Sequence, residues 1–209
     1  MIKVILCDDH AVVRRGIRDT ISEAVDIQVV GEAGSYPELR EQMRKVECDV
    51  LVLDLNMPGR GGLEVLAALR DEGSLVKTLV VSMYPEDQYA IRCLRAGARG
   101  YVNKAGEPAE LVAAIRTVQQ GRKYVTPEVA QMLVDNLNAP ESQELHASLS
   151  ERELQTLQKI ASGKKLSEIA EELMLSPKTV SVYRARVLEK LHLANNAELT
   201  VCAIRNSLV

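Results

Sequence analysis

Short apolar runs alternate with longer amphipathic segments through the first 121 residues of the chain. Four of these runs cover residues 3–7, 50–53, 77–81 and 100–102. Apolar runs of this length, between segments of helical period, are typical of buried parallel strands. Helical periodicity predicts helices over residues 11–24, 37–45, 62–70, 86–96 and 108–120. Five strand–helix alternations predict an α/β fold, a doubly wound five-stranded parallel sheet with helices on both faces.

Only helical patterns follow residue 126. One short helix is predicted over residues 126–137, and the polar residues 138–147 indicate a flexible linker. Four helices come next: Ser150 and Glu153 open the first as a capping box, and the others cover residues 166–173, 177–191 and 196–205. The predicted division is an α/β domain (1–122), a linker with a short helix (123–147) and a small all-α four-helix domain (148–209).

The composition favours an intracellular globular protein. The 209 residues are 46% hydrophobic and include no Trp and no Phe, so aliphatic side chains must form the cores. No apolar stretch approaches the length of a membrane span, and the N-terminus lacks the pattern of a signal peptide. The four cysteines are dispersed, as is typical of reduced thiols rather than disulfides or metal ligands: Cys7, Cys48, Cys93 and Cys202. These features predict a cytoplasmic protein with no membrane partner.

The net charge of −3 is unevenly distributed. Residues 1–125 carry 17 basic and 18 acidic groups, and residues 126–147 carry 4 acidic groups and no basic one. Residues 148–209 carry 9 basic and 7 acidic groups. A slightly basic C-terminal unit behind an acidic linker is compatible with nucleic-acid binding.

Polar residues with reactive groups stand where the apolar runs stop. Asp8 and Asp9 follow the first run, Asp54 the second of the four, Ser82 the third and Lys104 the last. The carboxyl ends of parallel strands form one edge of a sheet, where ligands bind at the switch in strand order. We therefore expect three carboxylates, a hydroxyl and an ammonium to converge on one pocket, a grouping that suits Mg²⁺ and a phosphoryl group.

The chemistry of these residue types supports phosphoryl transfer. Mg²⁺ takes one or two carboxylates and keeps several waters, and the backbone carbonyl of Asn56 can complete its ligand shell. A carboxylate beside Mg²⁺ can attack phosphorus and form an aspartyl phosphate, which Lys104 and Ser82 would stabilise. Taken singly, each residue also has an ordinary interpretation: Asp9 or His10 can cap the helix that starts near residue 11. We assign no chemistry to His10.

Four short motifs resemble the signature set of two-component receiver domains, which have a flavodoxin-like fold. They are Cys-Asp-Asp-His (7–10), Leu-Asp-Leu-Asn-Met-Pro-Gly (53–59), Val-Ser (81–82) and Gly-Tyr-Val-Asn-Lys (100–104), and the resemblance covers residues 1–121. It implies Asp54 as the phosphoacceptor, Asp8 and Asp9 as Mg²⁺ ligands, Lys104 as the phosphoryl contact, and Ser82 with Tyr101 as a switch pair. Tyr101 would swing inward after phosphorylation. The implied phosphodonor is a sensor histidine kinase.

Residues 149–209 resemble the LuxR-type helix-turn-helix domain of the NarL/FixJ group. The matching segments are 149–153, 160–163, 168–170, 175–180 and 190–191. In the helix over 177–191, Val180, Val187 and Leu191 fall on one face, leaving small and basic residues opposite that can enter a major groove. The DNA contacts predicted in this way are Lys164, Lys165, Lys178, Thr179, Ser181, Val182, Arg184, Ala185 and Arg186. Some relatives carry Lys at positions 181 and 185, so direct base readout is expected to be sparse.

Together these features predict a response regulator that binds promoter DNA sequence-specifically, forms a homodimer when phosphorylated and has no enzyme activity beyond slow loss of its own phosphate. The predicted dimer surfaces are the first and fifth helices, or the last helix through Leu199 and Ala203. One alternative is a phosphohydrolase of the haloacid-dehalogenase type, which requires an Asp where Asn56 stands. Another is a receiver that serves as an unphosphorylated dimerisation platform, against which the intact acidic set argues.

Overall fold

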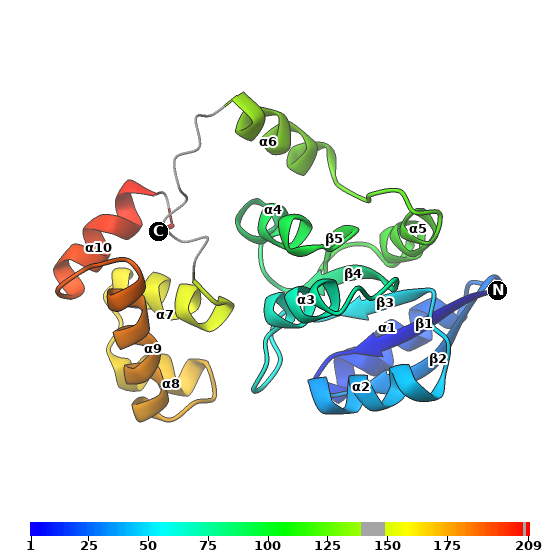
Figure 1. The fold of residues 1–209 in the computed structure, drawn as a ribbon, viewed down its shortest axis with the longest axis horizontal. Coiled ribbons are helices and arrows are strands. Elements are labelled where there is room, and N and C mark those ends of the chain that lie inside the picture. The colour runs from blue at the N-terminus through cyan, green and yellow to red at the C-terminus, as the bar shows by residue number, and fades with distance from the viewer. Residues whose placement is uncertain (139–148, 207) are drawn as a thin grey trace. The chain divides into compact units, whose positions relative to one another are not determined.

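The computed structural model describes residues 1–138, 149–206 and 208–209 of the chain (Figure 1). The chain forms two compact units, Met1–Asn138 and Ala139–Val209. Apart from Asn138, the flexible linker predicted over residues 138–147 lies outside the described residues.

The first unit contains the predicted parallel sheet. Its strands are β1 (Ile2–Cys7), β2 (Ile27–Ala33), β3 (Val50–Leu53), β4 (Lys77–Ser82) and β5 (Gly100–Asn103). Every neighbouring pair is parallel, and the spatial order is β2-β1-β3-β4-β5. The predicted fold class is confirmed.

Helices follow each strand of this sheet. They are α1 (Ala11–Ser22), α2 (Tyr36–Lys45), α3 (Gly62–Asp71), α4 (Glu86–Ala96) and α5 (Pro108–Gln119). Gly97 follows α4 with φ 117° and Gly121 lies just past α5 with φ 80°. These left-handed conformations strain a residue with a side chain, so glycine provides a clean end to the helix.

Aliphatic side chains from both sequence patterns meet in the core. Because side chains alternate along a strand, Val4 and Leu6 point to the face that α1 and α5 cover, where Ile21 and Ile115 pack against them. All four are at most 2% exposed. Burying each such side chain contributes about 1.5–3 kcal/mol, so this face fixes the positions of the strand ends.

The segment after α5 packs on the first unit. Tyr124 donates its backbone N–H to the Arg99 carbonyl at 2.8 Å and bridges to Gly100 of β5. Thr126 then donates its hydroxyl to Glu86 of α4 at 2.6 Å, and α6 (Pro127–Asn138) begins at the next residue. The short helix predicted within this part of the linker is therefore present as α6, and the segment that leads into it contacts β5 and α4.

The second unit contains the four predicted helices. They are α7 (Glu151–Ala161), α8 (Leu166–Glu172), α9 (Pro177–Lys190) and α10 (Asn196–Arg205). The predicted use of Leu199 and Ala203 as a dimer surface is wrong, because both side chains are 0% exposed and belong to the core of this unit. Periodicity located the apolar face of α10 but not the helices that cover it.

The capping box at the start of α7 is confirmed. Glu153 accepts a 2.7 Å hydrogen bond from the Ser150 N–H, and Lys190 of α9 lies 2.7 Å from the same carboxylate oxygen. Burial alone would raise the pKa of Glu153, but the hydrogen bonds from Lys190 and Ser150 outweigh burial and hold the pKa below its ordinary 4.5.

Replacing Glu153 by Gln is expected to destabilise the second unit by about 1–2 kcal/mol at neutral pH, because charge-assisted hydrogen bonds to a buried group are lost. A depressed pKa stabilises the fold above the unfolded value and loses that effect as pH falls through the folded value. The difference from wild type should therefore shrink below pH 4.5. Hydrogen exchange of α7 amides measures it, with Glu189→Gln, an exposed change, as control. A pH-independent difference would contradict the assignment.

Candidate functional site

The residues predicted to react lie at the carboxyl edge of the sheet, next to the switch in strand order between β1 and β3. Asp8 follows β1 directly, and Asp54 follows β3 directly. The backbone N–H of Asp54 donates to the Cys7 carbonyl of β1 at 2.8 Å. On the other side of β3, Ser82 ends β4 and Lys104 follows β5, and the Lys104 N–H donates to the Ser82 carbonyl at 2.8 Å. This edge is where ligands bind in open α/β sheets.

Lys104 joins two buried carboxylates. Its Nζ lies 2.7 Å from Asp8 Oδ2 and 3.0 Å from Asp54 Oδ2. The two aspartates are 3% exposed and the lysine side chain is 7% exposed. Burial raises the pKa of Asp54, an effect that Lys104 opposes and that the nearby Asp8 carboxylate reinforces. The pocket thus holds more negative charge than its one lysine neutralises.

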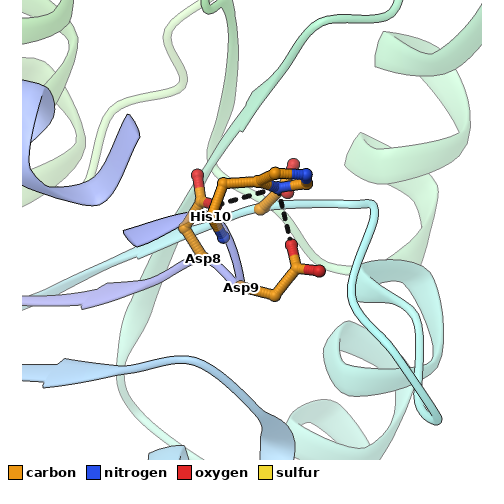
Figure 2. A group of neighbouring side chains, drawn as sticks. Asp8, Asp9 and His10 are labelled. Atoms are coloured by element: carbon orange, nitrogen blue, oxygen red, sulfur yellow. Dashed lines mark hydrogen bonds and ion pairs between the residues drawn. The ribbon is translucent and has the colours of Figure 1, made fainter. Parts of the chain in front are cut away.

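Asp9 and His10 complete the acidic cluster. Figure 2 shows His10 joined to its two neighbours: Nδ1 lies 2.8 Å from Asp9 Oδ1 and 3.6 Å from Asp8 Oδ1. One ligand atom from each of Asp8, Asp9, His10 and Asp54 lies within 4.8 Å of the others. His10 is the N-cap residue of α1 but makes no side-chain capping bond. Its place directly after two aspartates was the sequence signal for this proximity.

The oxygen atoms of the cluster fit a hard divalent cation. Asp8 Oδ2, Asp9 Oδ1 and Asp54 Oδ2 are buried oxygens whose printed neighbours are cationic or imidazole nitrogens, Lys104 Nζ for the first and third and His10 Nδ1 for the second. Mg²⁺ prefers such carboxylate oxygens, and its charge offsets their mutual repulsion. The donor set therefore suits Mg²⁺.

Two other predicted residues meet at the backbone of Tyr84. Ser82 Oγ accepts the Tyr84 N–H at 3.3 Å, and the Tyr101 hydroxyl donates to the Tyr84 carbonyl at 2.8 Å. Both side chains are 1% exposed. Tyr101 therefore already lies inward in this structure, and its hydroxyl holds the loop between β4 and α4.

The loop after Asp54 requires a close backbone approach. A Cβ at Gly62 would lie 2.6 Å from the Asp54 carbonyl and 2.7 Å from Leu55 Cα, so only glycine fits where α3 begins. Burial raises the pKa of Asp54, and the backbone hydrogen bond from Asn56, which also lies in this loop, partly opposes that rise. The role of the Asn56 carbonyl as a ligand stays a prediction.

In the second unit, α9 presents the predicted polar face. Val180 and Val187 are 0% exposed and Leu191 is 4% exposed. The residues expected opposite them are exposed: Lys178, Ser181, Val182, Ala185 and Arg186. At the start of this helix Pro177 has no N–H, the Ser176 hydroxyl accepts the Thr179 N–H at 3.1 Å, and Val180 donates to the Ser176 carbonyl, so the Lys178 amide is the one left in the first turn for an anion.

Several of the other predicted DNA contacts have partners inside the unit. Lys164 pairs with Glu172, which also binds Lys159. Arg184, half-buried at the rim of α9, donates to the Asn196 side chain at 2.6 Å. Lys165 is exposed and is the N-cap residue of α8. Lys164 and Arg184 would therefore share their N–H donors between these partners and DNA.

Comparison with known families decides the identity of both units. Residues 4–116 match the family described as response regulator receiver domain, and residues 147–203 match bacterial regulatory proteins of the luxR family. The chain is a response regulator of the NarL/FixJ type. Members of this family regulate transcription rather than turn over phosphate esters, which removes the phosphohydrolase alternative.

Relatives of this response regulator match it over 96–100% of its length. Response regulator UvrY of Escherichia coli (strain K12) is 41% identical, covering 100% of this chain and 96% of its own. RcsB of Salmonella enterica serovar Typhimurium, bound to promoter rprA in the presence of phosphomimetic BeF₃⁻, is 27% identical with TM-score 0.60, covering 96% and 97% of the two chains. A structure of two RcsB dimers bound to two parallel DNAs gives 27% identity and TM-score 0.60 over 97% and 98%.

The response regulator is thus a two-component transcription regulator with a receiver and a LuxR-type DNA-binding domain. Within residues 1–138, 149–206 and 208–209, no helix combines the length and apolar character needed to span a bilayer.

Proposed function

We propose that Asp54 accepts a phosphoryl group from a sensor histidine kinase, with Mg²⁺ held by Asp8, Asp9, Asp54 and the Asn56 backbone carbonyl. The observation that carries this proposal is the buried pocket in which Lys104 Nζ lies 2.7 and 3.0 Å from two aspartates. Such a pocket concentrates charge of both signs where a phosphoryl group can be received.

The transfer forms one bond and breaks one. A carboxylate oxygen of Asp54 attacks phosphorus on the donor phosphohistidine, the N–P bond breaks, and the imidazole nitrogen keeps the electron pair. Bound Mg²⁺ offsets the repulsion between the carboxylate and the phosphoryl oxygens. Lys104 Nζ neutralises one phosphoryl oxygen, and the Ser82 hydroxyl donates to another. Slow hydrolysis of the new aspartyl phosphate would keep the phosphoryl group on the receiver.

The switch acts through Tyr84. When Ser82 Oγ turns to a phosphoryl oxygen, it releases the Tyr84 N–H, while Tyr101 keeps the Tyr84 carbonyl. Because Tyr101 is already buried, the change falls on the β4–α4 loop rather than on an inward swing of the ring. A ten- to hundredfold change in DNA affinity requires only about 1.4–2.8 kcal/mol of differential stabilisation.

The output is binding of double-stranded promoter DNA by a homodimer. The exposed face of α9 enters the major groove through Ser181, Val182 and Ala185, with Arg184 and Arg186 beside it. Phosphate contacts come from Lys164, Lys165, Lys178 and Thr179. Two-fold pairing matches paired half-sites, and the RcsB dimers on DNA support this arrangement.

The test combines size and DNA binding. Acetyl phosphate with Mg²⁺ is expected to shift the wild-type chain toward a dimer in analytical ultracentrifugation and to raise its affinity for DNA selected from a random library. Asp54→Asn should show neither change. Unchanged size and affinity for phosphorylated wild type would refute the switch.

Replacing Lys178 by Ala is expected to weaken DNA binding by a similar factor for all sequences, because a phosphate contact carries no sequence information. The slope of log affinity against log salt should fall by about one unit. Arg205→Ala, an exposed cation on α10, is the control for the loss of charge. An unchanged slope would remove Lys178 from the interface.

A further inference from the structure

Arg14 connects the acidic loop to the neighbouring strand, a role that its sequence position did not suggest. It lies near the start of α1, and its side chain is 20% exposed. Nη1 donates to the Asp8 backbone carbonyl at 2.5 Å, and Nε lies 3.0 Å from Glu32 Oε2 on β2. One planar guanidinium therefore bridges the loop and the sheet.

The Asp8 carbonyl is a sensitive point to hold. It belongs to the planar peptide unit that joins Asp8 to Asp9, so fixing its oxygen restricts the torsions that aim both carboxylates. Hydrogen bonds also fix the other polar groups of Asp8. Its N–H donates to the Ala33 carbonyl at 3.0 Å, and its Oδ1 accepts the His10 N–H at 2.8 Å. Arg14 supplies the contact from the α1 side.

We propose that Arg14 is a positioning residue for the divalent cation, which keeps the carboxylates of Asp8 and Asp9 aimed at the site by clamping the Asp8 carbonyl against Glu32. The inference rests on the proposed Mg²⁺ site. Groups that orient metal ligands without touching the metal typically account for 10–100-fold in metal affinity.

The sign of the effect separates positioning from simple electrostatics. A nearby positive charge repels a divalent cation, so removal of the Arg14 charge alone would strengthen Mg²⁺ binding. Loss of positioning weakens it. The two roles therefore predict changes in opposite directions.

Two neighbours on α1 provide matched controls. Arg15 has a 76% exposed side chain and pairs at 3.9 Å with Asp19, so Arg15→Ala removes the same charge from the same helix. Arg18 Nη1 lies 3.0 Å from Glu32 Oε1, so Arg18→Ala perturbs Glu32 while leaving the Asp8 contact in place.

The experiment is a calorimetric titration of the full chain with MgCl₂, which measures the Mg²⁺ affinity of each variant. Arg14→Ala is expected to weaken Mg²⁺ binding about 10–100-fold relative to wild type. Arg14→Lys should fall between them, because one ammonium lacks the fork that reaches both partners. Arg15→Ala and Arg18→Ala should stay within about twofold of wild type, since neither holds the loop.

Each outcome of the titrations either supports or overturns the positioning role of Arg14. Binding by Arg14→Ala that equals or exceeds wild type overturns the positioning role, as does an equal loss in Arg15→Ala. Thermal unfolding checks that each variant is folded, and if Arg14→Ala is not, equal affinity of Arg14→Lys and wild type overturns the role. If wild type itself binds no Mg²⁺, the proposed cation site falls and the inference with it.

Discussion

A response regulator with Met in place of Lys104 is expected to lose about 3–5 kcal/mol of unfolding free energy when no divalent cation is present. The reason is that Asp8 and Asp54, each 3% exposed, would face one another without the ammonium that now lies within 3.0 Å of both. Methionine fills a similar volume, so the loss measures charge compensation rather than a cavity. Urea unfolding of the full chain, read by hydrogen exchange of β3 amides, measures the loss.

Mg²⁺ should restore much of this stability, since the cation supplies the missing positive charge. A ligand at one hundred times its dissociation constant stabilises a fold by about 2.7 kcal/mol. Lys45→Met is the matched control: Lys45 pairs with Glu41 on the exposed side of α2, where such pairs contribute about 0–1 kcal/mol. A Lys104→Met chain as stable as this control would show that the pocket does not need compensation.

Replacing Asp54 by Asn is expected to lower the rate of labelling by acetyl phosphate at least about a thousandfold, which corresponds to about 4 kcal/mol of lost transition-state stabilisation. An amide has no anionic oxygen to attack phosphorus, while the rest of the pocket keeps its shape. Intact-protein mass spectrometry of the full chain measures the rate.

Asp71→Asn is the control for this loss. Asp71 ends α3, its side chain is 71% exposed beside Arg70, and it does not belong to the acidic cluster of Asp8, Asp9, His10 and Asp54. Labelling of Asp71→Asn should match wild type. Labelling of Asp54→Asn within tenfold of wild type would assign the acceptor to another residue.

Local patterns determined most of the fold. The strand over 50–53 and the helix over 86–96 have the predicted bounds, because a buried apolar run defines β3 while Pro85 and Gly97 flank α4. The helix predicted to residue 24 ends at Ser22 instead. There the Ala24 N–H donates to the Ile21 carbonyl and the Ile27 N–H donates to the Ala24 carbonyl. These two turns redirect the chain into β2.

Contacts between distant segments could be predicted only where the order of parallel strands requires them. The convergence of Asp8, Asp54 and Lys104 followed from the rule that parallel strands end at one edge. The Arg14 contact with the Asp8 carbonyl depends on the backbone path of the loop, which no residue pattern records. Likewise, no pattern in the sequence indicated that Tyr124 pairs beside β5.

Locating the phosphoryl group on the chain tests the proposed role of Asp54 without any substitution. Wild-type chain treated with acetyl phosphate and Mg²⁺ is reduced with borohydride, which converts an aspartyl phosphate to homoserine, and is then mapped by peptide mass spectrometry. Homoserine is expected at position 54, and it should disappear when EDTA replaces Mg²⁺. Homoserine at another aspartate, or equal conversion of Asp54 in EDTA, would contradict the proposed role.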